Sequence, residues 1–128
     1  MLHILHGADL HLDAPFTGLS AEQARTRRAE LRELPGRLAD LAREREADLL
    51  LLSGDLFDGA DPYAETAQTQ ARAQGPAGCP VLIAPGNHDP YGPRSPYALL
   101  PWPENVHIFQ SAALEPIPMP KLGCTLWG

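Results

Sequence analysis

Three short apolar runs in this chain each lead directly into a group of polar residues that can bind metal ions. The groups are Asp9-Leu10-His11, Gly54-Asp55-Leu56-Phe57-Asp58 and Gly86-Asn87-His88-Asp89. The run before the second group, Leu49-Leu50-Leu51-Leu52, is apolar at every position, which is typical of a central strand covered on both faces. Segments with helical spacing separate the runs, so the order strand, helix, strand, helix, strand predicts a mainly parallel α/β sheet. In such a sheet, functional groups collect beyond the carboxyl ends of the strands, where all three groups fall.

The expected strands cover residues 2–8, 48–53 and 80–84, and residues 106–109 and 124–127 are candidates for two more. Eleven of the 14 prolines fall between Pro76 and Pro120. Proline cannot donate a backbone hydrogen bond and interrupts helices. This stretch should therefore consist of loops and short strands with little helix.

Two helices are expected between the first three strands. Ser20, with Gln23 three residues later, has the pattern of a helix N-cap with a capping box. Leucines at helical spacing continue this helix to about Glu46, and Pro35-Gly36 predicts either a kink or two helices in tandem. The second helix is expected over residues 63–74, and its alanine-rich face predicts thin packing.

Length and composition indicate one soluble globular domain, since the chain has 128 residues of which 44% are hydrophobic. The net charge of −6 by itself argues against a nucleic-acid partner. However, two divalent ions would add about four positive charges at the polar groups, so net charge does not exclude such a partner.

Cys79 and Cys124 form no CxxC pair, and no apolar segment is long enough for a membrane span. A cytoplasmic protein without membrane association is expected.

The residue types in the three groups suit two divalent metal ions, and two-metal sites cleave phosphate esters. Asp9 and His11 are two residues apart, so on an extended segment both side chains point to one side and can bind one ion. Asp55, at the end of the central strand, can bridge two ions with its carboxylate oxygens. Asn87 offers a neutral oxygen ligand, which leaves His88 free to donate a proton or hydrogen bond to a departing oxygen.

Three further residues near these groups have alternative interpretations. Asp58 either orients a ligand or bound water, or caps the next turn. Asp89 either fixes the tautomer of His88 or stabilises the turn, and the turn is favoured. His6, three residues before Asp9, is a candidate for supporting the site from behind the ligands. Seven of the ten basic residues lie between residues 25 and 45, where their alternation with glutamates favours a solvated helix face over a phosphate contact.

With these residues in view, the chain resembles the calcineurin-like metallophosphoesterases over its whole length. Residues 5–12, 54–58 and 84–90 are similar to the DNA-repair nuclease branch, which includes the SbcD and YhaO proteins, and residues 13–19 are particularly like YhaO. Protein Ser/Thr phosphatases usually continue the second motif with Arg-Gly, whereas here Gly59-Ala60 follows Asp58. The resemblance therefore favours the nuclease branch.

The resemblance implies a fold, a set of roles and a set of partners. The fold would be the N-terminal part of an αββα sandwich. Asp9 and His11 would hold the first metal ion, Asp55 would bridge, Asn87 would hold the second, and His88 would assist catalysis. The two divalent ions would be Mn²⁺. Members of this branch act on DNA as 3′-to-5′ exonucleases or endonucleases, usually with an SbcC-like coiled-coil ATPase as partner.

The chain also departs from the family pattern. Family members carry downstream histidines, in a His-Gly-like context and in a Gly-His-x-His motif, that complete both metal shells, whereas only His107 follows His88 here. We therefore expect residues 1–128 to be the truncated N-terminal portion of a single nuclease domain, weakly active or inactive alone. Two alternatives remain: a nucleotide phosphodiesterase or phosphatase of the same fold, and a non-catalytic remnant for oligomerisation or ATPase docking. Exposed sheet edges would favour self-association of the fragment.

Overall fold

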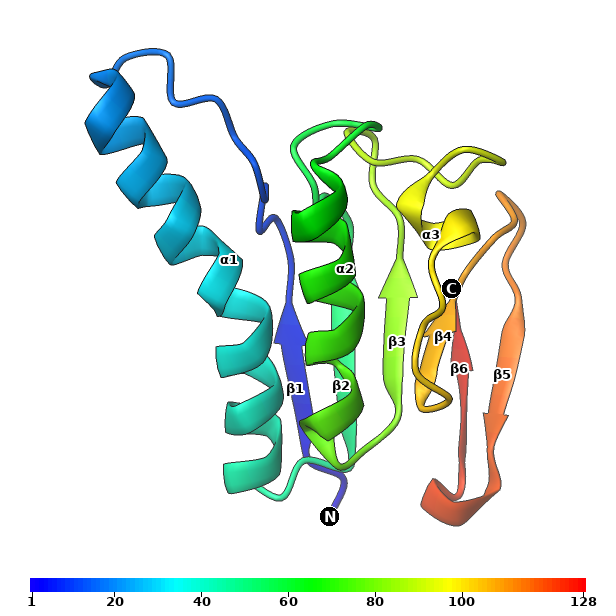
Figure 1. Ribbon diagram of the computed structural model, residues 1–128. Coiled ribbons are helices and arrows are strands. Elements are labelled where there is room, and N and C mark those ends of the chain that lie inside the picture. Colours follow the sequence, from blue (N-terminus) through cyan, green and yellow to red (C-terminus); the bar gives the residue numbers. More distant parts are fainter.

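A four-stranded parallel sheet with two helices on one face forms the centre of the computed structural model, which describes residues 1–128 (Figure 1). The strands lie in the order β1 (Ile4–Gly7), β2 (Leu49–Ser53), β3 (Val81–Ala84) and β4 (Val106–Ile108). The crossover helices are α1 (Ala21–Glu44) and α2 (Ala64–Ala73). The predicted α/β fold with a mainly parallel sheet is confirmed.

The central strand is buried as its uninterrupted leucine run predicts. Leu49, Leu50 and Leu52 of β2 are at most 1% exposed. On the helix side of the sheet, the main core contains Ile83 of β3. It also contains Leu12, Leu56 and Phe57, which lie in the segments that follow β1 and β2, so packing of the core fixes these segments. Because the same segments carry the first two polar groups, the core also holds these polar groups in place.

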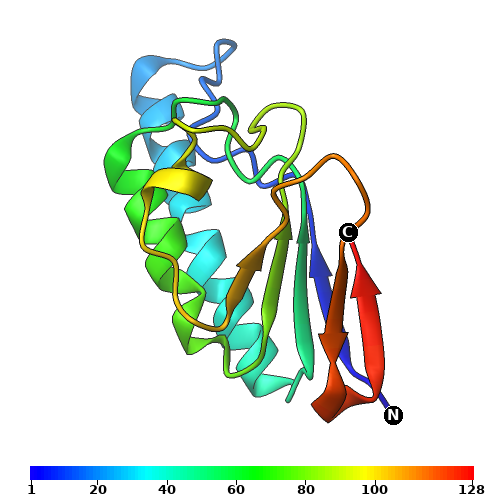
Figure 2. The ribbon, with the colours of Figure 1, turned by 90° about the vertical axis from the view of Figure 1, so that its right-hand side faces the viewer.

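A two-stranded antiparallel hairpin covers part of the other face of the sheet, as Figure 2 shows from the side. It consists of β5 (Pro116–Met119) and β6 (Cys124–Trp127), joined by a 3₁₀ turn over Pro120–Leu122. Strand β6 was expected from the sequence but β5 was not, because Pro116 and Pro118 argue against a strand. The prolines are tolerated because only alternate residues of β5 form backbone hydrogen bonds with β6. Glu115 exchanges both backbone hydrogen bonds with Gly128, so in this register the backbone nitrogens of Pro116 and Pro118 point away from β6 and need no N–H.

Helix α1 begins at the predicted N-cap. The Gln23 N–H donates to Ser20 Oγ (3.3 Å), and the Ser20 N–H donates to Gln23 Oε1 (3.1 Å), which completes the capping box. The prediction of two helices in tandem is wrong, since one helix of 24 residues continues through Pro35. Pro35 is buried, so packing on both sides of it supports the helix despite the missing hydrogen bond.

Helix α2 confirms the second predicted helix and its limited apolar packing. It buries Thr66, Ala67, Gln70 and Ala71, of which only the alanines are apolar. A 3₁₀ turn at Gly75–Ala77 follows, and the proline-rich stretch contains only a single helical turn, α3 (Pro96–Leu99). None of the helices is both long enough and apolar enough to cross a membrane.

Candidate metal centre

The three polar groups meet at one edge of the sheet, where β1, β2 and β3 all end (Figure 1). Backbone hydrogen bonds join the first two groups directly: the Asp9 N–H donates to the Gly54 carbonyl (3.1 Å), and the His11 N–H donates to the Asp55 carbonyl (3.0 Å). Leu12 and Phe57 then form an isolated parallel bridge. The polar groups are therefore held by the same pairing that orders β1 beside β2.

The backbone at these residues is not extended, contrary to the expectation for Asp9 and His11. Their φ angles are 55° and 45°, and that of Asp55 is 52°, all in the left-handed region that non-glycine residues rarely adopt. Each such residue costs about 1–3 kcal/mol and persists where surrounding contacts fix it. The two side chains still approach each other, with 3.8 Å between Asp9 Oδ1 and His11 Nε2.

His11 belongs to two groups of residues that can bind a metal ion. In one group it lies with Asp9 and Asp55, in the other with Asp58 and His88, and within each group the ligand atoms lie no more than 4.8 Å apart. Asp58 Oδ1 accepts a hydrogen bond from His11 Nδ1 (2.9 Å). A carboxylate in this position fixes the imidazole tautomer and leaves Nε2 as the free ligand atom. This contact agrees with the alternative in which Asp58 orients a ligand.

Asp55 is packed against the loop of the third group. It is 9% exposed, and its Oδ1 accepts a hydrogen bond from the His88 backbone N–H (2.9 Å). A Cβ at Gly86 would overlap the Asp55 carboxylate, and a Cβ at Gly54 would lie 3.3 Å from Gly86 Cα. Glycine at both positions therefore permits the close approach of the two loops. Asn87, between Gly86 and His88, lies in the same loop.

Asp89 stabilises the junction of the two loops from inside. It is 1% exposed, and its oxygens accept hydrogen bonds from the backbone N–H groups of Asp55 (3.1 Å), Phe57 (3.1 Å) and Gly86 (2.7 Å). The Tyr97 hydroxyl donates a fourth, to Oδ2. These contacts agree with the turn-stabilising alternative. Burial, and then the charge of Asp89, raise the pKa of Tyr97, so this hydroxyl remains a donor.

Asp13, whose side chain is 8% exposed, connects the loop after His11 to both helices. Oδ1 accepts hydrogen bonds from the Arg32 guanidinium (2.9 and 3.2 Å) and from Thr66 Oγ1 (2.9 Å), and Oδ2 accepts one from the Tyr63 N–H (3.0 Å). No such contacts of Asp13 or Tyr97 were expected from the sequence. No local pattern could have found them, because each partner is distant in the sequence or belongs to no motif.

The remaining histidines differ in their relation to this site. The His88 ring lies 5.0 Å from the His11 ring, and its Nδ1 is 3.3 Å from the Asp58 carbonyl oxygen. His6 contacts Ser53 Oγ at the end of β2 (2.9 Å) and belongs to neither group of candidate metal ligands. His107 lies on β4 and packs against Phe109.

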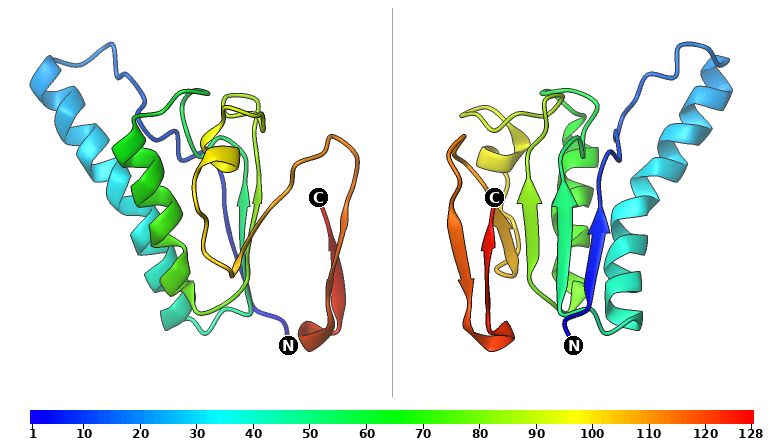
Figure 3. Two further views of the ribbon diagram at one scale, coloured as in Figure 1. Left: turned by 45° about the vertical axis from the view of Figure 1, so that its right-hand side comes forward. Right: turned by 180° about the vertical axis from the view of Figure 1, so that it is seen from behind.

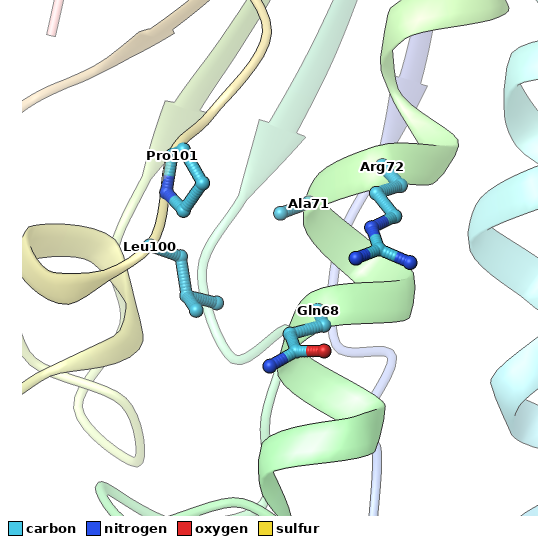
Figure 4. A pocket seen from close by; sticks show the side chains of 5 residues that line it. All are labelled: Gln68, Ala71, Arg72, Leu100 and Pro101. Atoms are coloured by element: carbon cyan, nitrogen blue, oxygen red, sulfur yellow. The ribbon is translucent and has the colours of Figure 1, made fainter.

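A cavity of about 130 Å³ lies away from these residues, between α2 and the segment after α3 (Figure 4). Its lining residues are Gln68, Ala71, Arg72, Leu100 and Pro101. None of them is a candidate metal ligand, so the cavity does not belong to the metal centre.

The sequence profile of the calcineurin-like phosphoesterases matches residues 2–124. The chain belongs to this family. Its phosphoesterase relatives include the uncharacterized metallophosphoesterase YhaO of Bacillus subtilis strain 168, which is 36% identical over 124 residues, covering 89% of this chain and 29% of YhaO. The SbcD component of the nuclease SbcCD from Rhodobacter capsulatus is 31% identical over 94 residues, or 70% of this chain and 22% of the relative. The corresponding SbcD component from Escherichia coli K12 is 30% identical over 91 residues, or 69% of this chain and 21% of the relative.

This metallophosphoesterase chain spans less than a third of the length of these relatives. The family binds divalent metals, and the two groups that share His11 offer the carboxylate and imidazole ligands that such ions require. The arrangement at the edge of the sheet is therefore consistent with the chemistry of the family.

Proposed function

We propose that this chain carries part of a two-metal site that hydrolyses phosphodiester bonds in DNA. The observation that carries the proposal is the group of Asp9, His11 and Asp55, whose ligand atoms lie within 4.8 Å of one another at the carboxyl edge of the sheet. In this proposal Asp9 and His11 hold the first ion, Asp55 contacts both ions, and Asn87 holds the second. His88 donates a hydrogen bond or proton to the departing oxygen.

The neighbouring residues support these roles by fixing the ligands. Asp58 holds His11 Nδ1, which directs Nε2 toward Asp9. Asp89 holds the backbone of both the Asp55 loop and the Gly86 loop, so the two ligand-bearing segments keep a constant separation. Divalent ions at such a site polarise a phosphoryl group and lower the pKa of water. Mixed oxygen and imidazole ligands suit an ion of intermediate hardness, and we propose Mn²⁺.

DNA is proposed as the substrate because two of the relatives above are named as components of a nuclease. By the same analogy, an SbcC-like coiled-coil ATPase is the proposed partner of the longer protein.

We also propose that residues 1–128 are the N-terminal portion of a single nuclease domain, because only two imidazoles, His11 and His88, belong to the metal-binding groups. A cytoplasmic location is proposed since Cys79 and Cys124 are both free thiols.

The proposal is tested by titrating the chain with Mn²⁺ in a calorimeter and assaying hydrolysis of DNA and of an aryl phosphodiester. We expect weak Mn²⁺ binding that is lost in Asp55→Asn, because this substitution removes a charged oxygen common to both ions. Asp61→Asn is the matched control, since Asp61 is exposed and belongs to neither metal-binding group.

Equal binding of Mn²⁺ by the wild type and Asp55→Asn would contradict the proposed ligand set. Two tight Mn²⁺ sites on the monomeric chain would contradict the proposal that ligands are missing from residues 1–128. Hydrolysis of the aryl phosphodiester without any hydrolysis of DNA would favour a phosphodiesterase that acts on small substrates.

A further inference from the structure

The Tyr63 ring is exposed to solvent although the residue is firmly held. Tyr63 is 63% exposed, yet its backbone N–H donates to Asp13 Oδ2 (3.0 Å). The Arg32 guanidinium carbon lies over the ring, 5.8 Å from its centroid, and Arg32 is itself fixed by two hydrogen bonds to Asp13. A guanidinium over an aromatic face is attractive, so one face of the ring is supported while much of the residue remains open.

This ring stands at the same edge of the sheet as the candidate metal centre. Tyr63 is the N-cap residue of α2, and α2 begins at the edge where β1, β2 and β3 end (Figure 1). The connections in the sequence are short: Tyr63 follows Asp58 by five residues, and its partner Asp13 follows His11 by two. A polymeric substrate that extended along this edge from the metal centre toward α2 would meet Tyr63.

Two arginines of α1 near Arg32 in the helix have no acidic partner. On α1, Arg25 and Arg28 share the helix face of Arg32 and pair with no carboxylate, whereas Arg27, Arg37 and Arg43 each pair with an acidic residue. The Arg28 guanidinium donates to the Pro15 carbonyl (3.3 Å), which holds it beside the loop that follows His11.

Exposed Asp61 and Glu65 flank Tyr63 in the sequence, so the ring itself is a poor neighbour for phosphate. An uncharged planar group suits the ring better, and the unpaired arginines of α1 suit the phosphates. Nucleobases stack on exposed aromatic side chains when they are unpaired, and such sites combine aromatic rings with basic residues that follow the backbone.

We propose that Tyr63 is a stacking platform for an unpaired nucleobase of single-stranded DNA, and that Arg25 and Arg28 contact its phosphates. The inference rests on the proposed function and assigns its substrate a single-stranded segment next to the metal centre. Stacking requires the aromatic ring but not the hydroxyl, which separates this role from a structural role of the hydroxyl group.

The test is the binding of a fluorescent short oligothymidylate, measured by anisotropy with a chelator present so that no hydrolysis occurs. A matched oligomer of the same length without bases is measured in parallel. We expect Tyr63→Ala to weaken binding of the oligothymidylate about tenfold and to leave the base-free oligomer unchanged, while Tyr63→Phe binds both normally. Arg25→Gln should weaken binding of both oligomers and lower the salt dependence.

Unchanged oligothymidylate binding in Tyr63→Ala overturns the inference, as does equal loss for the two oligomers. Absence of any binding by the wild-type chain also overturns it. Because binding is read without metal, the result is independent of hydrolysis: a failure of Mn²⁺-dependent cleavage counts against the proposed function alone. Circular dichroism of each variant verifies the fold, which the exposed position of Tyr63 should leave intact.

Discussion

Gly86 is the residue at which the geometry of the metal centre leaves the least room for change. A Cβ at this position would overlap the Asp55 carboxylate, while the Gly86 N–H is bound to Asp89 Oδ1 (2.7 Å). We expect Gly86→Ala to displace Asp55 and weaken Mn²⁺ binding by at least about tenfold, as for other residues that orient metal ligands. Calorimetric titration measures the change. Gly92→Ala is the control, because a Cβ there meets nothing within 4 Å; equal losses in both variants would contradict the prediction.

Tyr97 gives the stability of the protein a dependence on alkaline pH. Burial, and then the charge of Asp89, raise its pKa, so the folded state keeps the proton where the unfolded chain ionises, near pH 10. The stabilisation from Tyr97 is therefore complete below about pH 10 and is lost as the pH rises, by about 1.4 kcal/mol per pH unit.

Urea unfolding of Tyr97→Phe at several pH values tests this dependence. At neutral pH we expect the variant to be about 1.5–3 kcal/mol less stable, since a hydrogen bond to a buried carboxylate is lost. Above about pH 10 the gap between wild type and variant should narrow, because phenylalanine has no proton to lose. A gap that stays constant would show that Tyr97 ionises equally in both states.

Helix α2 carries a destabilising feature that its packing does not compensate. Gln70 is completely buried, and neither polar atom of its amide has a hydrogen-bond partner. We expect Gln70→Leu to raise the free energy of unfolding by about 1–2 kcal/mol, because leucine has a similar size and helix propensity and leaves no amide unpaired. Urea unfolding measures it, with exposed Gln68→Leu as a control expected within about 0.5 kcal/mol. A loss of stability in Gln70→Leu would mean that the amide does have a partner.

At the level of elements, the sequence was sufficient where the deciding interactions are local. The capping box at Ser20 and Gln23 lies within four residues, and the leucine run of β2 determines its burial by composition alone. The continuation of α1 through Pro35 depends on packing of the helix at both ends, which no local pattern records. Strand β5 likewise depends on β6, since its prolines are acceptable only in this pairing register.

In the candidate site, too, the sequence predicted some features, whereas contacts between residues far apart in the sequence were missed. The meeting of Asp9, Asp55 and the Gly86 loop follows from parallel strands that end at one edge, so the sequence predicted it. The contacts that stiffen the site join residues far apart: Asp89 to Phe57, Asp13 to Thr66, and Asp58 to His11. The left-handed backbone at Asp9 and His11 was also missed, because it results from pairing with residues 54–57.

For the whole molecule, the hairpin covers the sheet unevenly, as the two views of Figure 3 show. Ile117, Met119 and Leu126 pack against a second cluster formed by Leu49, Leu82 and Phe109. Strand β1 lies at the opposite end of the sheet from β4 and has a partner on one side only. Ile4, which is paired with Leu49 in the parallel register, is 47% exposed. An unprotected edge strand with an apolar side chain is a site of association between chains.

We therefore expect the 128-residue chain to self-associate through β1, and Ile4→Lys to raise the dissociation constant at least about tenfold. Lysine places a charge on the edge strand and removes an apolar side chain whose burial contributes about 1.5–3 kcal/mol. Sedimentation equilibrium over a range of concentrations measures the change. Leu19→Lys is the matched control, since Leu19 is similarly exposed (41%) but lies in the loop before α1, away from the sheet. Equal weakening of self-association by both variants would indicate a general effect of charge. A wild-type chain that stays monomeric would contradict the prediction of association through β1.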